Sequence, residues 1–590
     1  LATAKRLPIE FLKSNAVGWQ DFRFFEDPAI KIPYLDPHAQ EAGIKFRVSL
    51  NGPGLRTRWR KGSKASLYGL WRLDEIRAIG WTLLVEGETD TVTAWHADVP
   101  CLGLPGADGW NEPRDAAHLD GISEVYVVIE GDVNGKPDDG GARVLDWLGR
   151  SSLDGRARLL RLAPHNDLNE LWLADPDVGR FRAAVKAAMD EAQTFITWAA
   201  ERTDAERSDA FEAAGDLTDD PAVLDRFAEA LASSGVAGLE REARLVYLAL
   251  TSRLLDRPQG VVIKGVSAAG KSFLLKSVVR FFPESAFYEL TAQSERALLY
   301  GTEPLAHRFL VIAEWAALAG REFGPYLLRS LISEQRLRYE VVELDPKTNQ
   351  HVTRLIERPG PTSALISTTD VVTDDQLETR LMSVTVSDTA EQTAAVLGVL
   401  ADETPHSVDL GSWLALQRWL ERGPREVTIP FAPALAKLVP PKAVRLRRDF
   451  GALLVLIRAC ALLHQANRRR DRAGRIVATL EDYDTVRALV GGTIAAAVEA
   501  TVPATVRELV AAIPMLGDEK TGVTRRKLAE ALSLDVSSIS RRVKRAESYV
   551  VNLEDRRNKA ARYWTGDPLP DDVEILPSLD RLADACWAEA

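Results

Sequence analysis

Residues 265–272 (GVSAAGKS) carry the residue types and the spacing that bind a phosphate chain. An apolar run, residues 260–263, precedes them and an apolar segment, residues 273–280, follows, so we expect a strand, a glycine loop and a helix. Backbone N–H groups of such a loop surround phosphates, and the helix N-terminus favours anions. The spacing GxxxxGKS is that of a P-loop. It predicts that Gly265 and Gly270 shape the loop, that Lys271 reaches the β- and γ-phosphates of ATP, and that Ser272 holds Mg²⁺.

Nucleotide hydrolysis also needs polar groups beside the phosphates, and two further apolar runs end in such groups. Residues 309–313 lead to Glu314, which we expect to orient or activate the attacking water. Position 313 is Ala, where an Asp that binds the metal usually stands, so metal binding by this strand would be indirect. Residues 363–367 lead to Thr368 and Thr369, either of which can hydrogen-bond the γ-phosphate or the water.

Arg380 stands just before a fourth strand-like run, residues 381–384. The order of P-loop, apolar run with Glu, apolar run with a polar end, and Arg resembles that of the AAA+ ATPases. The resemblance implies that Arg380 is a finger reaching the nucleotide of a neighbouring subunit and that Thr368 or Thr369 is the sensor. A nucleotide site that is completed by a neighbouring subunit implies a ring of subunits. We expect this ring to be a homo-hexamer. Arg448, in a predicted helical lid, is a further candidate for contact with the nucleotide.

Two alternating runs around the turn sequence DPKTN, within residues 337–356, predict a β-hairpin. Its place before the sensor strand resembles that of the DNA-contacting hairpin in hexameric helicases of the MCM and viral superfamily 3 type. By that resemblance, Lys347 in the turn grips the phosphate backbone of DNA inside a channel. The alternative is a surface hairpin with a solvated lysine.

Acidic residues follow two apolar runs in the N-terminal third of the chain. Glu86 follows residues 81–85, Glu130 and Asp132 follow residues 125–129, and Asp167 comes later. Such continuous runs are typical of buried parallel strands, whose C-terminal ends meet at one crevice. Carboxylates gathered there would hold Mg²⁺ together with water and phosphate.

This pattern resembles the Toprim domain of DnaG-type primases, topoisomerases and certain nucleases, in which one strand ends in EG and a DxD motif follows the next. Glu86 and Gly87 match the first motif, with Asp90 beyond; Glu130 stands in place of the first Asp, and residues 133–139 are inserted. The resemblance implies that Glu86 is a general acid/base and metal ligand, and that Glu130 and Asp132 hold Mg²⁺ or Mn²⁺. Asp167 is a weaker fourth member. The alternative is solvated acidic loops on a Rossmann-like sheet.

Basic and aromatic residues are interleaved within residues 46–70, which suits a single-stranded template through phosphate contacts and base stacking. The segment resembles the one that precedes the Toprim domain in phage-type primases. The residues expected to contact DNA are Arg56, Arg58, Arg60, Lys61 and Lys64 through charge, and Trp59 and Tyr68 through stacking.

Residues 522–532 and 536–546 predict two helices joined by a turn, followed by two short strands at residues 550–553 and 561–564. Thr524 is placed to cap the first helix. The pattern is that of a helix-turn-helix with a wing, and we expect Arg541 and Arg542 to face a DNA groove. Docking of a protein is the alternative.

Composition limits the class of protein. Of 590 residues, 46% are hydrophobic and 27% charged, as in soluble globular proteins with several domains. No apolar stretch approaches the roughly 20 residues that span a bilayer, and no signal peptide is visible. We therefore expect a cytoplasmic protein without membrane contact. The net charge of −11 excludes a uniformly basic surface but not local basic grooves. Only Cys101, Cys460 and Cys586 occur, too far apart for a zinc ribbon.

These features predict a multidomain α/β protein. Its expected parts are a basic N-terminal primase subdomain (1–75), a Toprim domain (76–190), a helical linker or collar (191–250), an AAA+ ATPase domain (251–400), a helical lid region (401–500), a winged-helix domain (501–566) and a tail (567–590). An acidic stretch, residues 204–225, suggests a linker within the third part.

The whole pattern resembles a primase-helicase of a phage or mobile element. The resemblance implies ATP-driven movement on single-stranded and forked DNA, coupled to primer synthesis from nucleoside triphosphates. One alternative is an ATP-dependent Toprim nuclease of phage defence, although the heptad pattern of that class's coiled-coil arm is not seen. The other is a replication initiator or loader ATPase whose altered Toprim domain only binds DNA.

Overall fold

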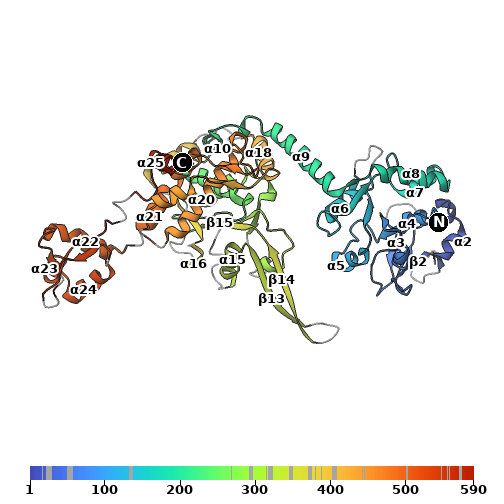
Figure 1. Cartoon of the computed structure of the whole chain (residues 1–590), viewed down its shortest axis with the longest axis horizontal. Coiled ribbons are helices and arrows are strands. Elements are labelled where there is room, and N and C mark those ends of the chain that lie inside the picture. The colour runs from blue at the N-terminus through green and yellow to red at the C-terminus, as the bar shows by residue number, and fades with distance from the viewer. Residues whose placement is uncertain are drawn as a thin grey trace. The chain divides into compact units, whose positions relative to one another are not determined.

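A computed structural model divides the chain between residues 205 and 206, inside helix α9 (Phe195–Ala214), into two units of mixed α/β structure (Figure 1). The structure describes all residues except 16, 21–28, 50–56, 132–136, 268, 291–296, 314, 316–322, 345–349, 370–374, 379, 387–388, 402–407, 442, 444, 500–501, 547, 555, 557–558, 570–573 and 590. The acidic stretch expected to be a linker is largely helical, because α9 and α10 (Val223–Ser233) occupy most of it.

The first unit begins with two short helices, α1 (Ala2–Lys5) and α2 (Ile9–Ser14), and an antiparallel sheet. The sheet runs in sequence order through β1 (Gly18–Gln20), β2 (Ala29–Leu35), β3 (Glu41–Arg47) and β4 (Thr57–Trp59). Tyr34, Ile44 and Phe46 are buried on it. The edge strand β4 therefore carries Arg58 on a supported backbone.

A second, mostly parallel sheet forms the centre of the first unit. Its order is β6 (Cys101–Leu104), β5 (Trp81–Glu86), β7 (Glu124–Val128), β8 (Ala157–Leu160) and β9 (Gln193–Thr194), of which only β9 is antiparallel to its neighbour. Helices α3 (Leu73–Ile79), α4 (Glu88–His96), α5 (Glu112–Asp115), α6 (Asp139–Leu148), α7 (Leu168–Ala174) and α8 (Val178–Glu191) accompany it.

Both faces of this sheet are buried, which explains the continuous apolar runs of its strands. Leu83 and Val85 pack in one core and Leu84 in another, because side chains of a strand alternate between faces. The predicted strands at residues 81–85 and 125–129 are confirmed.

The second unit contains a five-stranded parallel sheet. Its order is β11 (Phe287–Leu290), β12 (Arg308–Ile312), β15 (Thr362–Thr368), β10 (Gly260–Lys264) and β16 (Leu381–Thr385). The helices around it are α11 (Glu240–Thr251), α12 (Lys271–Val279), α13 (Ala297–Tyr300), α15 (Phe323–Glu334), α16 (Asp375–Glu378) and α17 (Ala390–Ala401). All four strands predicted from the sequence are present, and β11 is additional.

A long hairpin leaves this sheet. Strands β13 (Arg336–Leu344) and β14 (His351–Pro359) pair in register over nine residues each and project as a two-stranded arm (Figure 1). The predicted hairpin is confirmed, but its turn, with Lys347, lies outside the described residues.

Helices dominate the rest of the second unit, as expected. They are α18 (Gly411–Glu421), α19 (Ala432–Leu438), α20 (Leu446–Leu463), α21 (Leu480–Glu499) and α25 (Leu579–Glu589), with short strands β17 (Val427–Thr428) and β18 (Ile476–Val477). The C-terminal segment returns to this core: the hydroxyl of Tyr483 on α21 donates to the Pro577 carbonyl at 2.6 Å, and Leu582 of α25 is buried. Residues 501–566 are thus inserted between two core helices.

The inserted segment has its own core. It consists of α22 (Ala504–Leu516), α23 (Arg525–Ala531) and α24 (Val536–Arg545), with a sheet in the order β19 (Val523–Thr524), β21 (Arg562–Thr565), β20 (Val550–Asn552). The two predicted helices and two predicted strands are present, and the Thr524 hydroxyl caps α23 by accepting from the Lys527 N–H.

Among the described residues, no single helix has the length and apolar character needed to cross a membrane. Only α21 and α22 taken together, with an 82° bend between them, meet that criterion.

Candidate functional site

Three carboxylates of the first unit gather at the C-terminal edge of its parallel sheet. Asp90 lies in the first turn of α4 directly after β5, Glu130 follows β7, and Asp167 caps α7. One oxygen from each lies within 4.8 Å of one from each of the others. Carboxylate oxygens at this spacing are ligands that a hard divalent cation such as Mg²⁺ prefers, so the residues fit such an ion.

The electrostatics of the cluster also favour a cation. Burial, followed by the charges of Glu86, Asp90 and Asp167, raises the pKa of Glu130 to about 9. Burial and the Asp167 charge raise the pKa of Asp90 to about 8. Burial raises the pKa of Glu86 as well. The carboxylates destabilise one another's charged forms, and a bound divalent cation would reverse that effect.

Two glycines let helix α6 approach these acids. A Cβ atom on Gly140 would lie 3.0 Å from Glu86 Oε2, and one on Gly141 would lie 2.2 Å from the carbonyl oxygen of Glu130. A larger residue at Gly141 would displace the backbone that carries Glu130. The structure therefore brings Glu86, Glu130 and Asp167 into one region, as predicted, whereas Asp132 lies outside the described residues.

Asp90 is the member of the cluster to which the sequence alone assigned no role. It is buried, and its Oδ1 accepts a hydrogen bond from the Asn169 N–H at 2.8 Å. The Asn169 side chain in turn accepts from Lys5 Nζ at 2.5 Å. The available signal was its position in the first helical turn after Glu86 and Gly87, which places its side chain beside the strand end.

A buried ion pair fixes the N-terminal sheet beside α4. Lys45 Nζ on β3 lies 2.7 Å from Glu88 Oε1, and both side chains are buried. The hydroxyl of Tyr34 on β2 also donates to Glu88. Nearby, Arg47 donates to the Thr89 hydroxyl at 2.5 Å. Glu88 is thus a structural residue, and the basic sheet is held against the helix that carries Asp90.

We predict that Mg²⁺ binding to this cluster releases protons at pH 7. Asp90 and Glu130 are protonated in the metal-free folded protein up to their raised pKa values of about 8 and about 9, but they ionise near pH 4 in the unfolded chain. Between those limits the folded state holds more protons, so the stability of the metal-free protein falls as pH rises. Mg²⁺ binds the deprotonated acids and should reduce this fall.

Calorimetric titration of the protein with Mg²⁺ in two buffers of different ionisation enthalpy checks the prediction. The apparent binding heats should differ in proportion to the buffer enthalpy. Equal heats in both buffers would show that no proton leaves and would contradict the assignment of these acids as ligands.

The predicted P-loop, residues 265–272 of the second unit, stands between a strand and a helix, as expected. Strand β10 leads into the loop, and Gly270, with φ of 86°, precedes α12. Glycine adopts this left-handed conformation without strain. The Lys271 amine donates to the Val266 carbonyl at 2.6 Å, and burial lowers its pKa. The lysine therefore bends back over the loop that would hold phosphates; Ala268 lies outside the described residues.

Strand β15 lies between β10 and β12, so the polar residues at its end lie beside both. Thr368 pairs in register with Lys264 at the start of the loop. The Ser367 hydroxyl donates to the Ala313 carbonyl, and Ser272 Oγ lies 3.5 Å from the same oxygen. Thr368 is buried and Thr369 is exposed. The predicted sensor position thus adjoins the P-loop, whereas Glu314 lies outside the described residues.

A cavity of about 500 Å³ opens beside the loop. One wall consists of residues 235–237 and Leu239, and another of Val266, Gly270 and Phe273. One side of α17, including Leu397, completes the lining. Mostly apolar walls with few polar groups suit a planar base. The exposed apolar residues of α17, among them Leu400 at 76% exposure, extend this wall.

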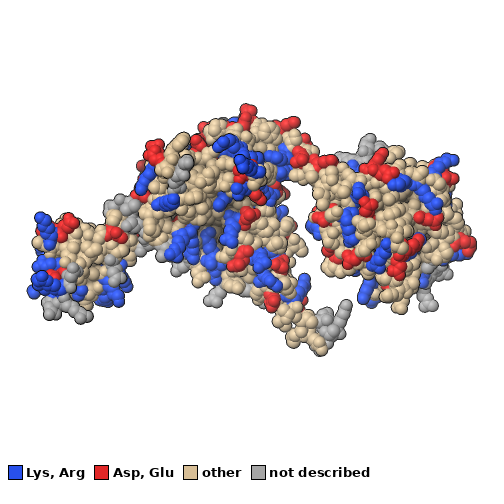
Figure 2. All heavy atoms as spheres, viewed as in Figure 1, with Lys and Arg blue, Asp and Glu red and all other residues tan. Residues whose placement is uncertain are grey.

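A second cavity, of about 380 Å³, lies at the other edge of the sheet. Leu381 pairs with Gly260, the first residue of β10, so Arg380 sits at the opposite end of that strand from the P-loop. The cavity is lined by Arg257, Arg380, Arg445, Arg447 and Arg448 and by one acid, Asp449. Figure 2 shows blue side chains gathered on this face around α16 and α21. Such a cavity is suited to an anionic ligand.

Arg448, which was expected to contact nucleotide from a helical lid, lies away from the predicted phosphate loop. Arg448 shares the second cavity with Arg380, and no P-loop residue lines that cavity. The reason is that α20 begins beside the β16 edge of the sheet instead of covering the P-loop end.

No family model matches the chain, and no curated protein matches it. Parts of the chain are similar to solved DnaG-type primase domains. The zinc-binding and RNA polymerase domains of the Aquifex aeolicus primase match at 13% identity and a TM-score of 0.29, over 39% of this chain and 64% of that one.

Two further structures give similar values. The RNA polymerase domain of Mycobacterium tuberculosis DnaG, in complex with double-stranded DNA, matches at 14% identity and a TM-score of 0.28, over 35% of this chain and 76% of that one. The primase fragment of the bacteriophage T7 primase-helicase matches at 16% identity and a TM-score of 0.23, over 30% of this chain and 70% of that one. Values this low assign neither a family nor an activity.

The basic segment of the first unit keeps its charges at the surface, whereas the two aromatic residues expected to stack on bases pack against other rings. Trp59 is half-buried, with its ring centroid 4.6 Å from that of Tyr34. Arg58, Arg60, Lys61 and Lys64 are exposed, while Arg56 lies outside the described residues. Tyr68 is completely buried and stacks on Trp95 with ring centroids 5.3 Å apart. The expectation that Tyr68 stacks on a base is wrong, because the ring belongs to the core between the two sheets.

Helix α24 carries the predicted groove-facing residues in two different environments. Arg541 is exposed and donates to the Ser538 hydroxyl at 3.0 Å. Arg542 instead pairs with Glu508 on α22 at 2.8 Å and is only 18% exposed. Arg542 therefore connects two helices, and the exposed cations of this helix are Arg541, Lys544 and Arg545.

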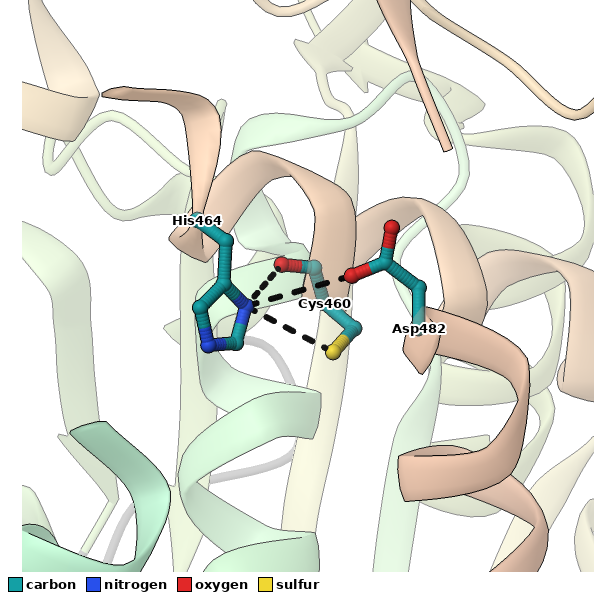
Figure 3. Close-up of side chains that lie close together, drawn as sticks. All are labelled: Cys460, His464 and Asp482. Carbon is teal, nitrogen blue, oxygen red and sulfur yellow. Dashed lines mark hydrogen bonds and ion pairs between the residues drawn. The ribbon is translucent and has the colours of Figure 1, made fainter. Parts of the chain in front are cut away.

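Cys460, His464 and Asp482 lie close enough together to be considered a metal site (Figure 3). Their contacts are already satisfied within the protein. Both Asp482 oxygens accept from Arg468, at 2.7 and 3.0 Å, and His464 Nδ1 lies 2.9 Å from the Cys460 carbonyl oxygen. Burial raises the pKa of the Cys460 thiol well above its ordinary value, which disfavours the thiolate that binds metals. We interpret the cluster as a structural network between α20 and α21.

Substitution of Asp482 by Asn should be strongly destabilising. Asp482 is fully buried and Arg468 is 14% exposed, so the change leaves a largely buried guanidinium without its counterion. We expect a loss of about 3–5 kcal/mol in the free energy of unfolding of the second unit, measured by urea denaturation. Asp471→Asn is the control, because its pair with Arg475 is more exposed, and it should lower stability much less than Asp482→Asn. Equal losses would refute the structural role.

Proposed function

We propose that the chain is a Toprim-type DNA primase joined to an AAA+ ATPase that moves DNA. One observation supports the proposal: a single chain carries two separate groups of residues that are suited to magnesium–phosphate chemistry. One is the cluster of Asp90, Glu130 and Asp167, and the other is the P-loop with Lys271 and Ser272. The setting we propose is replication of a phage, plasmid or integrated element.

At the first site the chain's own residues hold and orient the reactants. Asp90, Glu130 and Asp167, with Asp132, would hold Mg²⁺ or Mn²⁺, which supplies positive charge to the phosphates of the incoming nucleotide. Glu86 stands at the edge of the cluster, and burial raises its pKa. A raised pKa favours a role as the group that accepts and returns a proton during the reaction. Exposed Arg58, Arg60, Lys61 and Lys64 would contact the template backbone.

At the second site the position of β15 supports an ATPase. Lys271 and Ser272 would contact the phosphates and Mg²⁺, and Thr368, beside the loop, would sense the γ-phosphate. Glu314 would act on the water. Arg380, at the far edge of the same sheet, would complete the site of a neighbouring copy, with Arg448 beside it. Six copies in a ring would place the β13–β14 arms and Lys347 toward a common DNA strand.

The inserted α22–β21 segment has the elements of a winged helix, and we assign DNA contact to α24. Arg541→Ala should weaken binding to all duplex sequences similarly and lower the salt slope of log K by about 1. Arg542→Ala should leave that slope unchanged and reduce stability by about 1 kcal/mol or less, because its partner Glu508 is exposed. Fluorescence anisotropy over a salt series separates the two. An unchanged slope for Arg541→Ala would favour protein docking.

Product analysis tests the primase assignment against its alternatives. The protein is incubated with single-stranded DNA, Mg²⁺ or Mn²⁺ and labelled nucleotides, and products are resolved by length. New oligonucleotides support a primase. A shortened template with no synthesis would instead indicate a nuclease, and neither change would indicate a motor or initiator whose first site is inactive.

A further inference from the structure

The residue before the P-loop makes an ion pair that leads to Arg380. Lys264 is the last residue of β10 and directly precedes Gly265. Its Nζ lies 2.6 Å from Glu378 Oε1, and the two side chains are only 16% and 19% exposed. Glu378 is the last residue of α16, two positions before Arg380. A charged contact this short and this sheltered holds the two segments together.

Arg380 is positioned by the same helix. Its N–H donates to the Leu377 carbonyl at 2.9 Å, and its guanidinium donates to the Gln376 carbonyl. Its Nε also donates to the Ser333 hydroxyl on α15 at 2.5 Å. Two of these three contacts attach Arg380 to α16, so a movement of α16 would act on its guanidinium.

The far end of the same segment is also attached to the P-loop. The Val386 N–H, just after β16, donates to the Lys264 carbonyl at 2.8 Å. A Cβ atom on Gly265 would lie 3.0 Å from the Val386 carbonyl oxygen, so the start of the loop touches this residue closely. Glu378 and Val386 are thus both attached to residues 264–265, Glu378 through its side chain and Val386 through its backbone. Arg380 lies between these attachments.

We propose that the Lys264–Glu378 pair couples the occupancy of one subunit's P-loop to the position of the arginine that it offers to the next subunit. This inference rests on the proposed ATPase with Arg380 acting across subunits. A triphosphate draws the loop backbone around itself and adds negative charge beside Lys264. The resulting shift at residues 264–265 passes to α16 and then to Arg380. Lys264 and Glu378 are positioning residues, since they act through Arg380.

A cavity of about 390 Å³ leaves room for such a movement. It is lined by Lys264, Glu378, Thr385 and Arg445, among others, and it shares Ser383, Arg445, Thr493 and Ala497 with the arginine cavity. The two cavities therefore adjoin along the edge strand β16. Small residues of α21 on the opposite wall, including Gly492, offer little steric resistance.

Glu378→Gln tests the coupling, because it keeps the size of the side chain and removes its charge. We expect affinity for a fluorescent ATP analogue to change less than about twofold, while kcat falls about 10- to 100-fold, as for a misplaced catalytic group. The Hill coefficient for ATP should fall toward 1. The charge-reversed double variant, Lys264→Glu with Glu378→Lys, should recover part of the wild-type kcat and part of the wild-type Hill coefficient. Glu303→Gln is the control, since its pair with Arg308, at 2.9 Å, lies at the other end of β12 from the P-loop.

The outcomes separate this inference from the function on which it rests. If Arg380→Ala leaves kcat unchanged, the composite ATPase site is wrong. If Arg380→Ala lowers kcat but Glu378→Gln retains the wild-type kcat and Hill coefficient, only the coupling is overturned. A fall in melting temperature for Glu378→Gln without loss of kcat or cooperativity would also overturn it, because the pair would then be merely structural.

Discussion

Lys271→Ala should abolish ATP hydrolysis and the unwinding of forked DNA. The Lys271 amine already lies over the P-loop, 2.6 Å from the Val266 carbonyl, where it would meet the phosphates of ATP. Alanine removes the only cation that the loop sequence supplies for charge developing on the transferred phosphoryl group. Loss of one such positioned donor costs about 10²- to 10³-fold in kcat. Phosphate release and strand separation are the two measurements.

Lys276→Ala is the matched control for this variant. Lys276 lies on the same helix, α12, and is exposed. It should hydrolyse ATP and unwind DNA at the wild-type rate. Wild-type hydrolysis by Lys271→Ala would show that residues 265–272 are not the nucleotide site.

Glu130→Gln should abolish primer synthesis while leaving ATP hydrolysis intact. The change keeps the size of the side chain but removes a charged ligand from the cluster with Asp90 and Asp167. We expect synthesis to fall by about 10²-fold or more, since metal-ion stabilisation of the transferring phosphate contributes several kcal/mol. Mg²⁺ affinity, measured by calorimetry, should fall in parallel.

Glu124→Gln provides the control for this second prediction. Glu124 begins the same strand, β7, at the opposite end from Glu130, and pairs with Arg158 at 2.8 Å on the surface. Synthesis by this variant should match that of the wild type. If Glu130→Gln also made primers at the wild-type rate, the acidic cluster would be a structural or regulatory feature.

The elements that position both sites were predictable from the sequence, because each has a strong local signal. Strands buried on both faces appear as continuous apolar runs, and these predicted β5, β7, β10 and β12 to within two residues. The P-loop spacing defined the start of α12. The hairpin was predictable from its alternating apolar and polar residues and from its turn sequence. Its two strands are adjacent in the sequence, so their pairing depends on local residues only.

Other features depend on long-range packing that one sequence does not reveal. Tyr68 was expected to stack on bases, but it fills the core between two sheets. Arg542 was expected to face DNA, but it pairs with Glu508, 34 residues away. Arg448 was expected near nucleotide, but the fold places it beside Arg380. In each case the residue type indicated the kind of interaction that the side chain makes. The tertiary structure determines which group is its partner.

Asp90 and the C-terminal helix α25 make long-range contacts that the sequence analysis did not predict. Asp90 became a member of the carboxylate cluster only when α7 brought Asp167 to it. Helix α25 was expected to be a tail, but its Leu582 completes the core of the second unit. The position of Asp90 in the first helical turn after Glu86 and Gly87 indicated that it lies beside the strand end, but not that Asp167 lies next to it. The contact of α25 with the core has no signal in the spacing of residues along the chain.

The two-site proposal is tested most directly by measuring primer synthesis and ATP hydrolysis on the same preparations of three proteins. These are the wild type, Lys271→Ala and Glu130→Gln. Primer synthesis on single-stranded DNA and ATP hydrolysis are followed in one Mg²⁺ buffer. We predict that Lys271→Ala retains synthesis on a bare template and loses hydrolysis, and that Glu130→Gln shows the reverse. Loss of both activities in each correctly folded variant, or of neither, would contradict the claim that the chain carries two independent magnesium–phosphate sites.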